Sequence, residues 1–513
     1  MPSSKRILLA ACVAAAIAAA PNAASAQKST GVLRVAINEP FTGVDPYNYP
    51  ATEAAFFYDD VYDMLINLDE NKKEFVPSLA KSWTRIDEKT IDFELYDDIA
   101  FHSGNKFTAD DVVYTLKYAA DPKVNIRFKT RYTIFDDIEK LGAHKVRLKF
   151  SSLYADDLLH AAMRTNIFDS KLHASYEDKV DYGRKSPVGT GPYKVTQFDR
   201  VQGVTLERVD GGRKHYYTRA PIKTVKGVFV PDEQTRIAQL LVGDVDMLYN
   251  VSPDNASQLG ANPKLGITPI ESLTLLHFKI DAMGRSKYKQ LTDPRVRKAI
   301  FMSVNREELI KSVVPGGDIA LRLNAMCFDS MLACDYTTKP PAYDPDGAKK
   351  LLAEAGYPDG FDIVLDSHIV TRKIAEAVSG YLRKVGIRAT VNPVLQANIT
   401  KRRASGEVGM IVSYAPQRSF PEASNILDMR FGVESVRYID DPRLFKAMAD
   451  GLASHDLAKR KAAYRGAFDL LNDISHAMPI SSLPTVWAHT RDVRIQPHIL
   501  GAARGAASNV FWN

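Results

Sequence analysis

The sequence predicts an α/β protein of two lobes, with an α+β segment inserted near its N-terminus. Its 513 residues exceed the usual size of one hydrophobic core, so two or three domains are expected. Hydrophobic residues at 45% and charged residues at 25% are typical of a globular chain. Strand-like and helix-like patterns alternate along the chain and form two strand–helix–strand units, 225–250 and 360–394.

Each strand–helix–strand unit predicts a pair of parallel strands. In 225–250, turn residues at 231–232 and 243–244 separate the helix from its flanking strands. In 360–394, the helix ends at Gly386, a residue suited to a left-handed C-cap. Crossovers of this length favour parallel pairing and a right-handed connection.

The N-terminal part predicts a mixture of strands and helices. A strand is expected at 32–38, an amphipathic helix at 51–67 and a hairpin at 90–104. Another helix is expected to start after Thr108, with Asp111 as the reciprocal partner of a capping box. Later helices are expected to begin at Asp293, Asn305, Asp344, Asp441 and Asp456.

The first 26 residues have the pattern of an export signal. A basic start is followed by a 14-residue apolar run, Ile7–Ala20, and by a small-residue cleavage site, Ala24–Ala26. The run is shorter than the roughly 20 residues that span a bilayer. A lipoprotein-type signal acylated at Cys12 is the alternative, but the apolar run continues past that residue. We therefore expect cleavage after Ala26 and a soluble protein in the periplasm.

The charge of the chain gives little support to a nucleic-acid or membrane partner. Removing the signal takes away Lys5 and Arg6, so the net charge falls from +6 to +4. This excess is small for a chain of such length. We expect no nucleic-acid partner.

Two cysteines, Cys327 and Cys334, remain after removal of the signal. In an oxidising compartment they predict a disulfide that closes a small loop. Two free buried thiols are the alternative. A metal site is disfavoured because no histidine lies close by in the sequence.

Sequence signatures of catalysis are missing. The chain contains no G-x-S-x-G, H-E-x-x-H or C-x-x-C motif. The G-x-G in VGTGPYK (188–194) lacks a third glycine, and a tight turn accounts for it. The eleven histidines are dispersed, with no pair four residues apart. We expect no enzymatic activity, no metal and no cofactor.

Six motifs follow one another in a recognisable order. They are PSLAKSW (77–83), FHSGNKFTADDVVYTL (101–116), SPVGTGPY (186–193), RIAQLLVGDVDM (236–247), DPRVRKAIFMSVNRE (293–307) and YDPDGAKKLLAEAGYPDGF (343–361). In this order and spacing they resemble the periplasmic solute-binding proteins of family 5, which are peptide, nickel and opine receptors of ABC importers. The resemblance extends from residue 31 to the C-terminus.

The resemblance implies a two-lobed, type II-like periplasmic-binding-protein fold with a two-strand hinge. The hinge strands would be 272–280 and 485–490. Because the chain would cross between the lobes only twice, the lobes could open and close. The implied segments are lobe I at 27–275 and 487–513, an α+β subdomain inserted in lobe I near 46–189, and lobe II at 276–486.

The resemblance also implies a function. The protein would capture a peptide-like or opine- or sugar-acid-like solute by lobe closure and deliver it to ABC permease subunits at the inner membrane. We expect it to act as a monomer. A sensory or chaperone-like periplasmic protein that presents its ligand to another partner is the alternative, because fold alone does not separate these roles.

SYAPQRSFPEASN (413–425) is the first candidate wall of the solute site. In peptide-binding members an aspartate after this strand pairs with the free amino group, and nickel receptors use a histidine nearby. Neither residue type is present here. Arg418 offers a planar donor fork for a carboxylate or phosphate, and Tyr414, Gln417 and Ser419 offer neutral hydrogen bonds. This composition predicts a solute with an acidic group and several hydroxyls or amides.

Two alternatives remain for this segment. Arg418 could be an ordinary solvated loop residue. Glu422 could replace the missing aspartate, in which case ordinary peptides would bind.

NEPFTGVDPYNYP (38–50) is the second candidate wall, because the turn after the first strand contacts ligand in related receptors. Phe41, Thr42 and Tyr47 are the expected contacts. The alternative is turn chemistry, since glycine, Asp-Pro and asparagine are standard turn formers.

Overall fold

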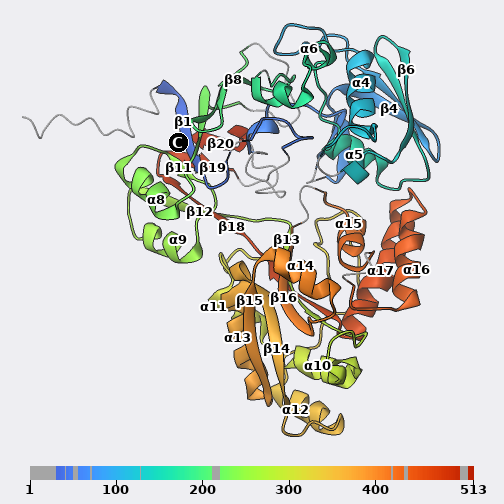
Figure 1. Cartoon of the computed structure of the whole chain (residues 1–513), viewed down its shortest axis with the longest axis vertical. Coiled ribbons are helices and arrows are strands. Elements are labelled where there is room, and N and C mark those ends of the chain that lie inside the picture. Colours follow the sequence, from blue (N-terminus) through green and yellow to red (C-terminus); the bar gives the residue numbers. More distant parts are fainter. Residues whose placement is uncertain are drawn as a thin grey trace, which may run out of the picture.

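A computed structural model of the chain shows three larger sheets and two two-stranded sheets, arranged in two lobes (Figure 1). It describes residues 30–40, 42–49, 56–69, 72–126, 129–185, 187–210, 220–416, 420–432, 437–496 and 507–513. The predicted signal segment and its cleavage site lie outside these ranges. Within them, no helix combines the length and the hydropathy that a membrane crossing requires.

A seven-stranded sheet forms the first lobe. Its central strand β1 (Val32–Ile37) is the strand predicted at 32–38, and it pairs in parallel with β10 and β11. Apolar residues bury both of its faces, Leu33 on one side and Ala36 on the other. In sheet order the strands are β12 (Leu265–Ile270), β18 (Thr485–Thr490), β11 (Met247–Leu248), β1, β10 (Thr224–Phe229), β9 (Gly203–Arg208) and β8 (Tyr193–Asp199), flanked by helices α8 (Glu233–Val242) and α9 (Pro253–Gly260).

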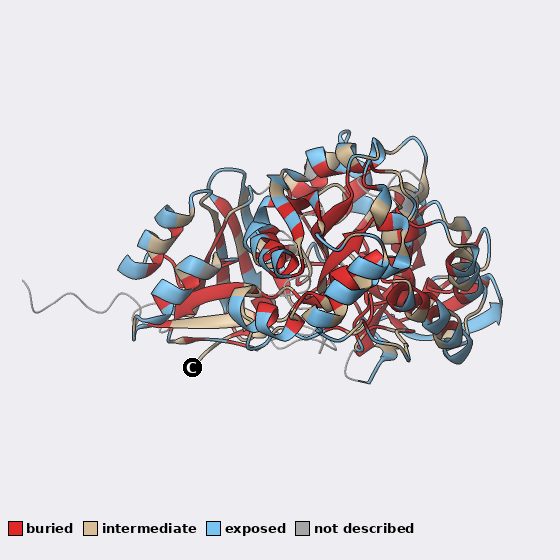
Figure 2. Cartoon of the chain, turned by 90° about the horizontal axis from the view of Figure 1, so that it is seen from below, coloured by how far each residue is buried: buried red, intermediate tan, exposed pale blue. Residues whose placement is uncertain are grey.

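A five-stranded sheet forms the second lobe. Its hydrophobic core lies between the sheet and helices α10 to α13, and the outward faces of the helices are exposed (Figure 2). In sheet order the strands are β15 (Ile387–Val394), β14 (Phe361–His368), β16 (Met410–Pro416), β13 (Thr274–Ile280) and β17 (Ala477–Ser482). The helices are α10 (Pro294–Met302), α11 (Arg306–Val313), α12 (Pro345–Glu354), α13 (Arg372–Lys384), α14 (Gln396–Ala404), α15 (Ala423–Leu427), α16 (Pro442–Leu452) and α17 (Leu457–Asp473).

A smaller antiparallel sheet is inserted between β1 and β8 of the first lobe, and we call this part the inserted subdomain. Its strands in sheet order are β4 (Ala80–Asp87), β5 (Thr90–Leu95), β7 (Lys145–Phe150) and β6 (Phe135–Gly142), next to the pair β2 (Ile66–Asp69) and β3 (Glu74–Pro77). Its helices are α4 (Ala109–Ala120), α5 (Asp157–Met163), α6 (Ser170–Ser175) and α7 (Tyr182–Lys185). Near the C-terminus, β19 (Val493–Ile495) pairs with β20 (Val510–Trp512).

Two short segments, 271–273 and 483–484, join the two larger sheets. They run side by side, because the amide of Leu483 donates to the carbonyl of Thr274 at 2.8 Å and the Ser272 hydroxyl donates to the carbonyl of Leu483 at 2.8 Å. The predicted lobe boundaries at 275 and 486 therefore fall inside β13 and β18 rather than between the sheets.

The predicted caps and crossovers agree with the structure. Thr108 and Asp111 form the capping box of α4, and α10, α11, α12, α16 and α17 begin after the predicted residues. Gly386 has a φ of 93° before β15, which pairs in parallel with β14. Cys327 and Cys334 are joined by a disulfide.

The helix predicted at 51–67 is wrong for the part that is described. Residues 51–55 lie outside the described ranges, and the helix that follows ends at Tyr58. Phe57 is buried beside the seven-stranded sheet, whereas Leu65 is buried in the core that includes the inserted subdomain. A single helix cannot bury its apolar face in two separate cores, so the chain turns between Phe57 and Leu65.

The hairpin predicted at 90–104 is also wrong. Its first half is β5, which pairs with β4 on one side and β7 on the other. Ile91, Phe93 and Leu95 are buried in a central strand. It forms a hairpin with the strand before it, β4, and its other partner, β7, lies about 50 residues further along the chain.

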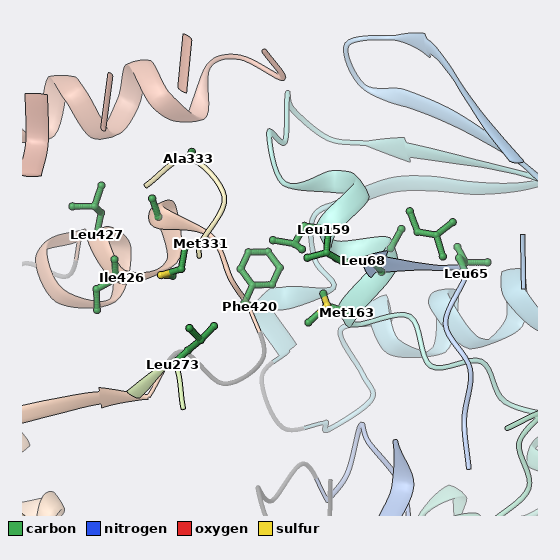
Figure 3. Packing of buried hydrophobic residues seen from close by; sticks show 14 of the residues in the cluster. Leu65, Leu68, Leu159, Met163, Leu273, Met331, Ala333, Phe420, Ile426 and Leu427 are labelled. Atoms are coloured by element: carbon green, nitrogen blue, oxygen red, sulfur yellow. The ribbon is translucent and has the colours of Figure 1, made fainter. Parts of the chain in front are cut away.

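One hydrophobic core is shared by the inserted subdomain and the second lobe (Figure 3). Phe420, which lies between β16 and α15, points toward Leu159 and Met163 of α5, with Met331 of the second lobe on its other side. The guanidinium of Arg164 lies 3.8 Å from the Phe420 ring centroid. The two lobes therefore touch through buried side chains.

Candidate functional site

The carboxyl ends of the parallel strands in the two large sheets face each other. In the second lobe β14, β15 and β16 are parallel, and the antiparallel β13 begins where they end. In the first lobe β12 ends at the same edge as β1 and β10, because β18 runs antiparallel to both β12 and β11. Since residues 271–273 connect the end of β12 to the start of β13, the two edges are adjacent. Open α/β sheets bind ligands at such edges.

Both predicted walls leave from these facing edges. The segment 38–50 follows β1, and the segment 413–425 includes the end of β16. Of the predicted contacts, Phe41, Gln417, Arg418 and Ser419 lie outside the described residues. Thr42 is half-buried, and its carbonyl accepts a hydrogen bond from Arg184 Nε at 3.2 Å.

Tyr47 is a core residue. Its side chain is buried, its hydroxyl donates to the carbonyl of Asn166 at 2.8 Å, and its ring lies 5.0 Å from that of Phe168. The backbone around it is held by Asp45, whose carboxylate accepts from the amide of Tyr47 at 2.7 Å. This arrangement matches the turn chemistry that was the alternative for this segment, and it leaves Tyr47 no free group for a solute.

Tyr47→Phe is therefore expected to lower the free energy of unfolding by about 1 kcal/mol, the usual value of one hydrogen bond. Its solute affinity should equal that of the unchanged protein. Urea unfolding and calorimetric titration check the two values separately. A tenfold loss of affinity without loss of stability would return Tyr47 to the solute site.

Glu422 is also buried, and it already has a partner. Its carboxylate lies 2.7 Å from the guanidinium of Arg460 in α17, and burial, followed by the charge of Asp156, raises its pKa well above the usual value. A carboxylate held in this way is poorly suited to pair with the amino group of a peptide. The alternative in which Glu422 replaces the missing aspartate loses its support.

Tyr414 lies at the carboxyl end of β16 and is half-buried. Its carbonyl accepts from Nη2 of Arg430 at 2.7 Å, and its ring lies 5.0 Å from that of His368, the last residue of β14. Nε2 of His368 lies 3.0 Å from the hydroxyl of Ser413. These contacts place Tyr414 among donors at the edge of the sheet.

A cluster of basic side chains lies beneath this edge, and we call His277, Lys279, Arg403 and Arg430 the basic group. Lys279 Nζ donates to the carbonyl of Arg430 at 3.0 Å, and His277 is opposite Ser413 in the pairing of β13 with β16. In the described part of the chain, Nε2 of His277, Nη2 of Arg403 and Nε of Arg430 have no hydrogen-bond partner.

Positive charge in the basic group is poorly compensated. Burial and then Arg403 lower the pKa of Arg430 to about 9. Burial, followed by Arg403 and Arg430, lowers the pKa of Lys279 well below its usual value. Burial and then Arg430 lower the pKa of the His277 ring in the same way. An anion placed here would reverse these effects, because an opposite charge favours the protonated forms.

Sequence reasoning missed the basic group. Its signal was the pair His277 and Lys279, which alternate with Leu276 and Phe278 in an otherwise apolar strand. Such alternation means that one face of β13 packs in the core and the other buries basic side chains. Arg403 comes from α14 and Arg430 from the short π-helix Asp428–Gly432, and no local pattern links them to β13.

Lys279→Met is expected to stabilise the folded protein at pH 7 by about 1–4 kcal/mol, as found when buried charges are replaced by apolar residues. Lysine in the unfolded chain has a pKa of about 10.4. The pKa of Lys279 is lower in the folded protein. As pH falls, Lys279 is therefore protonated in the unfolded chain before it is protonated in the folded one, and this difference destabilises the fold. The stability gained by Lys279→Met should nearly vanish at pH 10.5. Urea unfolding at both pH values measures it.

Lys350→Met is the matched control, because Lys350 is exposed on α12. Its effect should stay within about 0.5 kcal/mol at either pH. Equal effects of the two substitutions would contradict a depressed pKa for Lys279.

The two facing sheets, joined by two short segments and carrying an inserted subdomain, define a two-lobed periplasmic binding protein. Residues 74–435 match the family described as bacterial extracellular solute-binding proteins, family 5. The chain belongs to this family, as the order of its motifs indicated.

Similar proteins agree with this assignment. The glutathione-binding protein GsiB of Pectobacterium atrosepticum is 28% identical over 498 residues, covering 91% of each chain. The fold is shared with a dipeptide-binding protein from Pseudoalteromonas sp. SM9913 in complex with Met-Leu (TM-score 0.73, 21% identity, 94% of this chain and 100% of the other). It is also shared with AgaA from A. tumefaciens R10 in complex with agropinic acid (TM-score 0.68, 23% identity, 94% and 99%).

Proposed function

We propose that this protein is the periplasmic receptor of an ABC importer and that its solute is a peptide-like or opine- or sugar-acid-like compound with an acidic group. The observation that supports this solute class is the basic group beneath the carboxyl edge of β14 and β16. The molecules named for the similar proteins, glutathione, Met-Leu and agropinic acid, each carry a carboxylate.

An acidic solute would bind by supplying the charge that the basic group lacks. Arg430 carries a planar donor fork suited to a carboxylate, and Lys279 adds a point charge whose pKa rises toward normal once the anion is present. Ser413, Tyr414 and His368 would donate and accept hydrogen bonds around it. Arg418 remains a further proposed anchor from the same segment.

Lobe closure would follow from binding both walls at once. A solute that contacts the segment after β1 and the segment after β16 favours the closed arrangement over the open one. A micromolar dissociation constant corresponds to about 8 kcal/mol, and a shift from 1:99 to 99:1 requires about 5.5 kcal/mol of preference. One small solute is therefore sufficient to close the lobes.

The lobes would move about the segments 271–273 and 483–484. We place lobe I before the first segment and after the second, and lobe II between them. The predicted cleavage after Ala26, the monomeric state and the docking of the closed form on permease subunits belong to the same proposal.

Thermal unfolding with a solute panel tests the solute class. The panel contains glutathione, Met-Leu, agropinic acid, a neutral oligosaccharide and Met-Leu amide, which has the same side chains as Met-Leu but no carboxylate. A ligand at 100 times its dissociation constant adds about 2.7 kcal/mol, which raises the midpoint by a few degrees.

We expect a shift with at least one acidic compound and no shift with Met-Leu amide or the oligosaccharide. Equal shifts with Met-Leu and its amide would overturn the acidic-group requirement. A shift with the oligosaccharide alone would overturn the solute class and leave the receptor assignment in place.

A further inference from the structure

A buried cluster of charges connects the inserted subdomain to the second lobe. Arg460 of α17 forms ion pairs with Asp156, which precedes α5, and with Glu422, which precedes α15; the second pair measures 2.7 Å. The Ser424 hydroxyl donates to the other oxygen of Asp156 at 2.7 Å. In Figure 1 helices α15 and α17 lie next to α5 across the junction of the lobes.

All four of these side chains are more than nine-tenths buried. Arg460 also donates to the carbonyl of Ala155 at 2.7 Å. Burial alone would lower the pKa of Arg460, but the charges of Asp156 and Glu422 outweigh it and raise the pKa above its usual value. The cluster is therefore an ion-pair network in a desolvated interface, to which the first lobe contributes the carboxylate of Asp156 and the carbonyl of Ala155.

The geometry points to a pH-sensitive latch: we propose that the network of Asp156, Arg460 and Glu422 holds the lobes closed and that protonation of Glu422 tightens it. This inference rests on the proposed function only in requiring that the lobes open and close. If the lobes open by rotation at the segments 271–273 and 483–484, Asp156 separates from Arg460 and Ser424. Glu422 and Arg460 stay together in the second lobe.

The direction of the pH effect follows from the charge count. When both carboxylates are ionised, two negative charges and one positive charge are buried together, and this excess opposes closure. Among the residues that the structure describes, the charged and titratable groups facing Glu422 are Asp156, Arg460 and Tyr464 of α17. A protonated Glu422 leaves Asp156 and Arg460 as a neutral pair across the interface. The closed form thus takes up a proton, so closure is favoured as pH falls.

Asp156→Ala tests the latch itself. The Asp156 side chain makes no capping hydrogen bond to α5, so its removal leaves that helix start intact. Closure of this variant would bury the pair Arg460–Glu422 with no charged partner from the first lobe, leaving only the hydrogen bond to the carbonyl of Ala155. Glu422→Gln tests the role of the proton on Glu422, because the amide of glutamine is neutral and has the same shape as the protonated acid.

A second contact between the lobes provides the control. Lys373 of α13 and Asp254 of α9 form an ion pair of 2.6 Å between the same lobes, but their side chains are 69% and 72% exposed. Exposed pairs contribute little. Asp254→Ala should therefore leave lobe closure unchanged.

Small-angle X-ray scattering of the solute-free proteins at pH 5 and pH 8 measures lobe closure. We expect the unchanged protein and Asp254→Ala to have a smaller radius of gyration at pH 5 than at pH 8. Glu422→Gln should have the smaller radius of gyration at both pH 5 and pH 8. Asp156→Ala should have the larger radius at both. Identical radii for all four proteins at each pH would overturn the latch.

The solute-free measurement separates this inference from the proposed function. If the unchanged protein binds glutathione but Asp156→Ala scatters like the unchanged protein, the latch is refuted and the proposed receptor function stands. A protein that binds no compound of the panel but opens on Asp156→Ala would support the latch and refute the proposed solute class.

Discussion

Arg430→Ala is expected to weaken the binding of an acidic solute about 100-fold, which corresponds to about 2.7 kcal/mol. Removing one partner of a desolvated charge pair commonly costs about 2–5 kcal/mol. Stability of the solute-free protein should stay within about 1 kcal/mol of its original value, because Arg430 is opposed by the nearby charge of Arg403. Calorimetric titration with the most stabilising acidic solute, together with urea unfolding, measures both quantities.

Arg443→Ala is the control for this prediction. Arg443 lies on α16, is 72% exposed and pairs with Asp441. Its removal should change solute affinity less than twofold, about 0.4 kcal/mol. If Arg430→Ala binds the acidic solute as tightly as Arg443→Ala does, the acidic group must be held elsewhere, with Arg418 as the next residue to test.

Trp487→Ala is expected to lower the free energy of unfolding by about 3–5 kcal/mol, the usual cost of deleting a large buried aromatic side chain. Trp487 is 1% exposed on β18, and its ring centroid lies 5.0 Å from that of Tyr249 and 6.0 Å from that of Phe56. The three rings come from segments that are far apart in the sequence. Urea unfolding followed by circular dichroism gives the loss.

Trp487→Phe tests how much of this stability a smaller aromatic ring can retain. The indole Nε1 of Trp487 is buried without a hydrogen-bond partner in the described part of the chain, so its loss costs little. We expect a decrease smaller than that for alanine, about 1–2 kcal/mol, because phenylalanine keeps a six-membered ring and leaves a smaller cavity. Equal losses for phenylalanine and alanine would show that packing of this ring system is not what stabilises the sheet.

Local signals in the sequence predicted much of the fold. Helix starts such as Thr108 and Asp344 depend on hydrogen bonds within one turn, and Gly386 depends on its own φ angle. The family resemblance then supplied the arrangement of the lobes, which no single element specifies. What failed was the choice of partner, as in β5, which forms a hairpin with the preceding strand β4 and pairs on its other side with the distant β7.

The candidate site was predicted less well, for the same reason. Tyr47 and Glu422 were chosen for their chemistry, but their environments come from Asn166, Phe168 and Arg460, which are remote in sequence. The burial of Lys279 likewise depends on elements that follow it by more than a hundred residues. The two segments predicted as walls do leave from the facing edges of the sheets, but the sequence did not reveal which of their side chains are already engaged.

The position of β18 has a consequence for biosynthesis. This strand, residues 485–490, lies between β12 and β11 inside the seven-stranded sheet, although the chain makes it almost last. Until it leaves the ribosome, β12 has no neighbour in that sheet, and the aromatic cluster around Tyr249 lacks Trp487. At a synthesis rate of about 5–20 residues per second, the first lobe stays unfinished for about 20–90 seconds after synthesis of β1 begins. The seven-stranded sheet of the first lobe can therefore be completed only after nearly the whole chain has been synthesised.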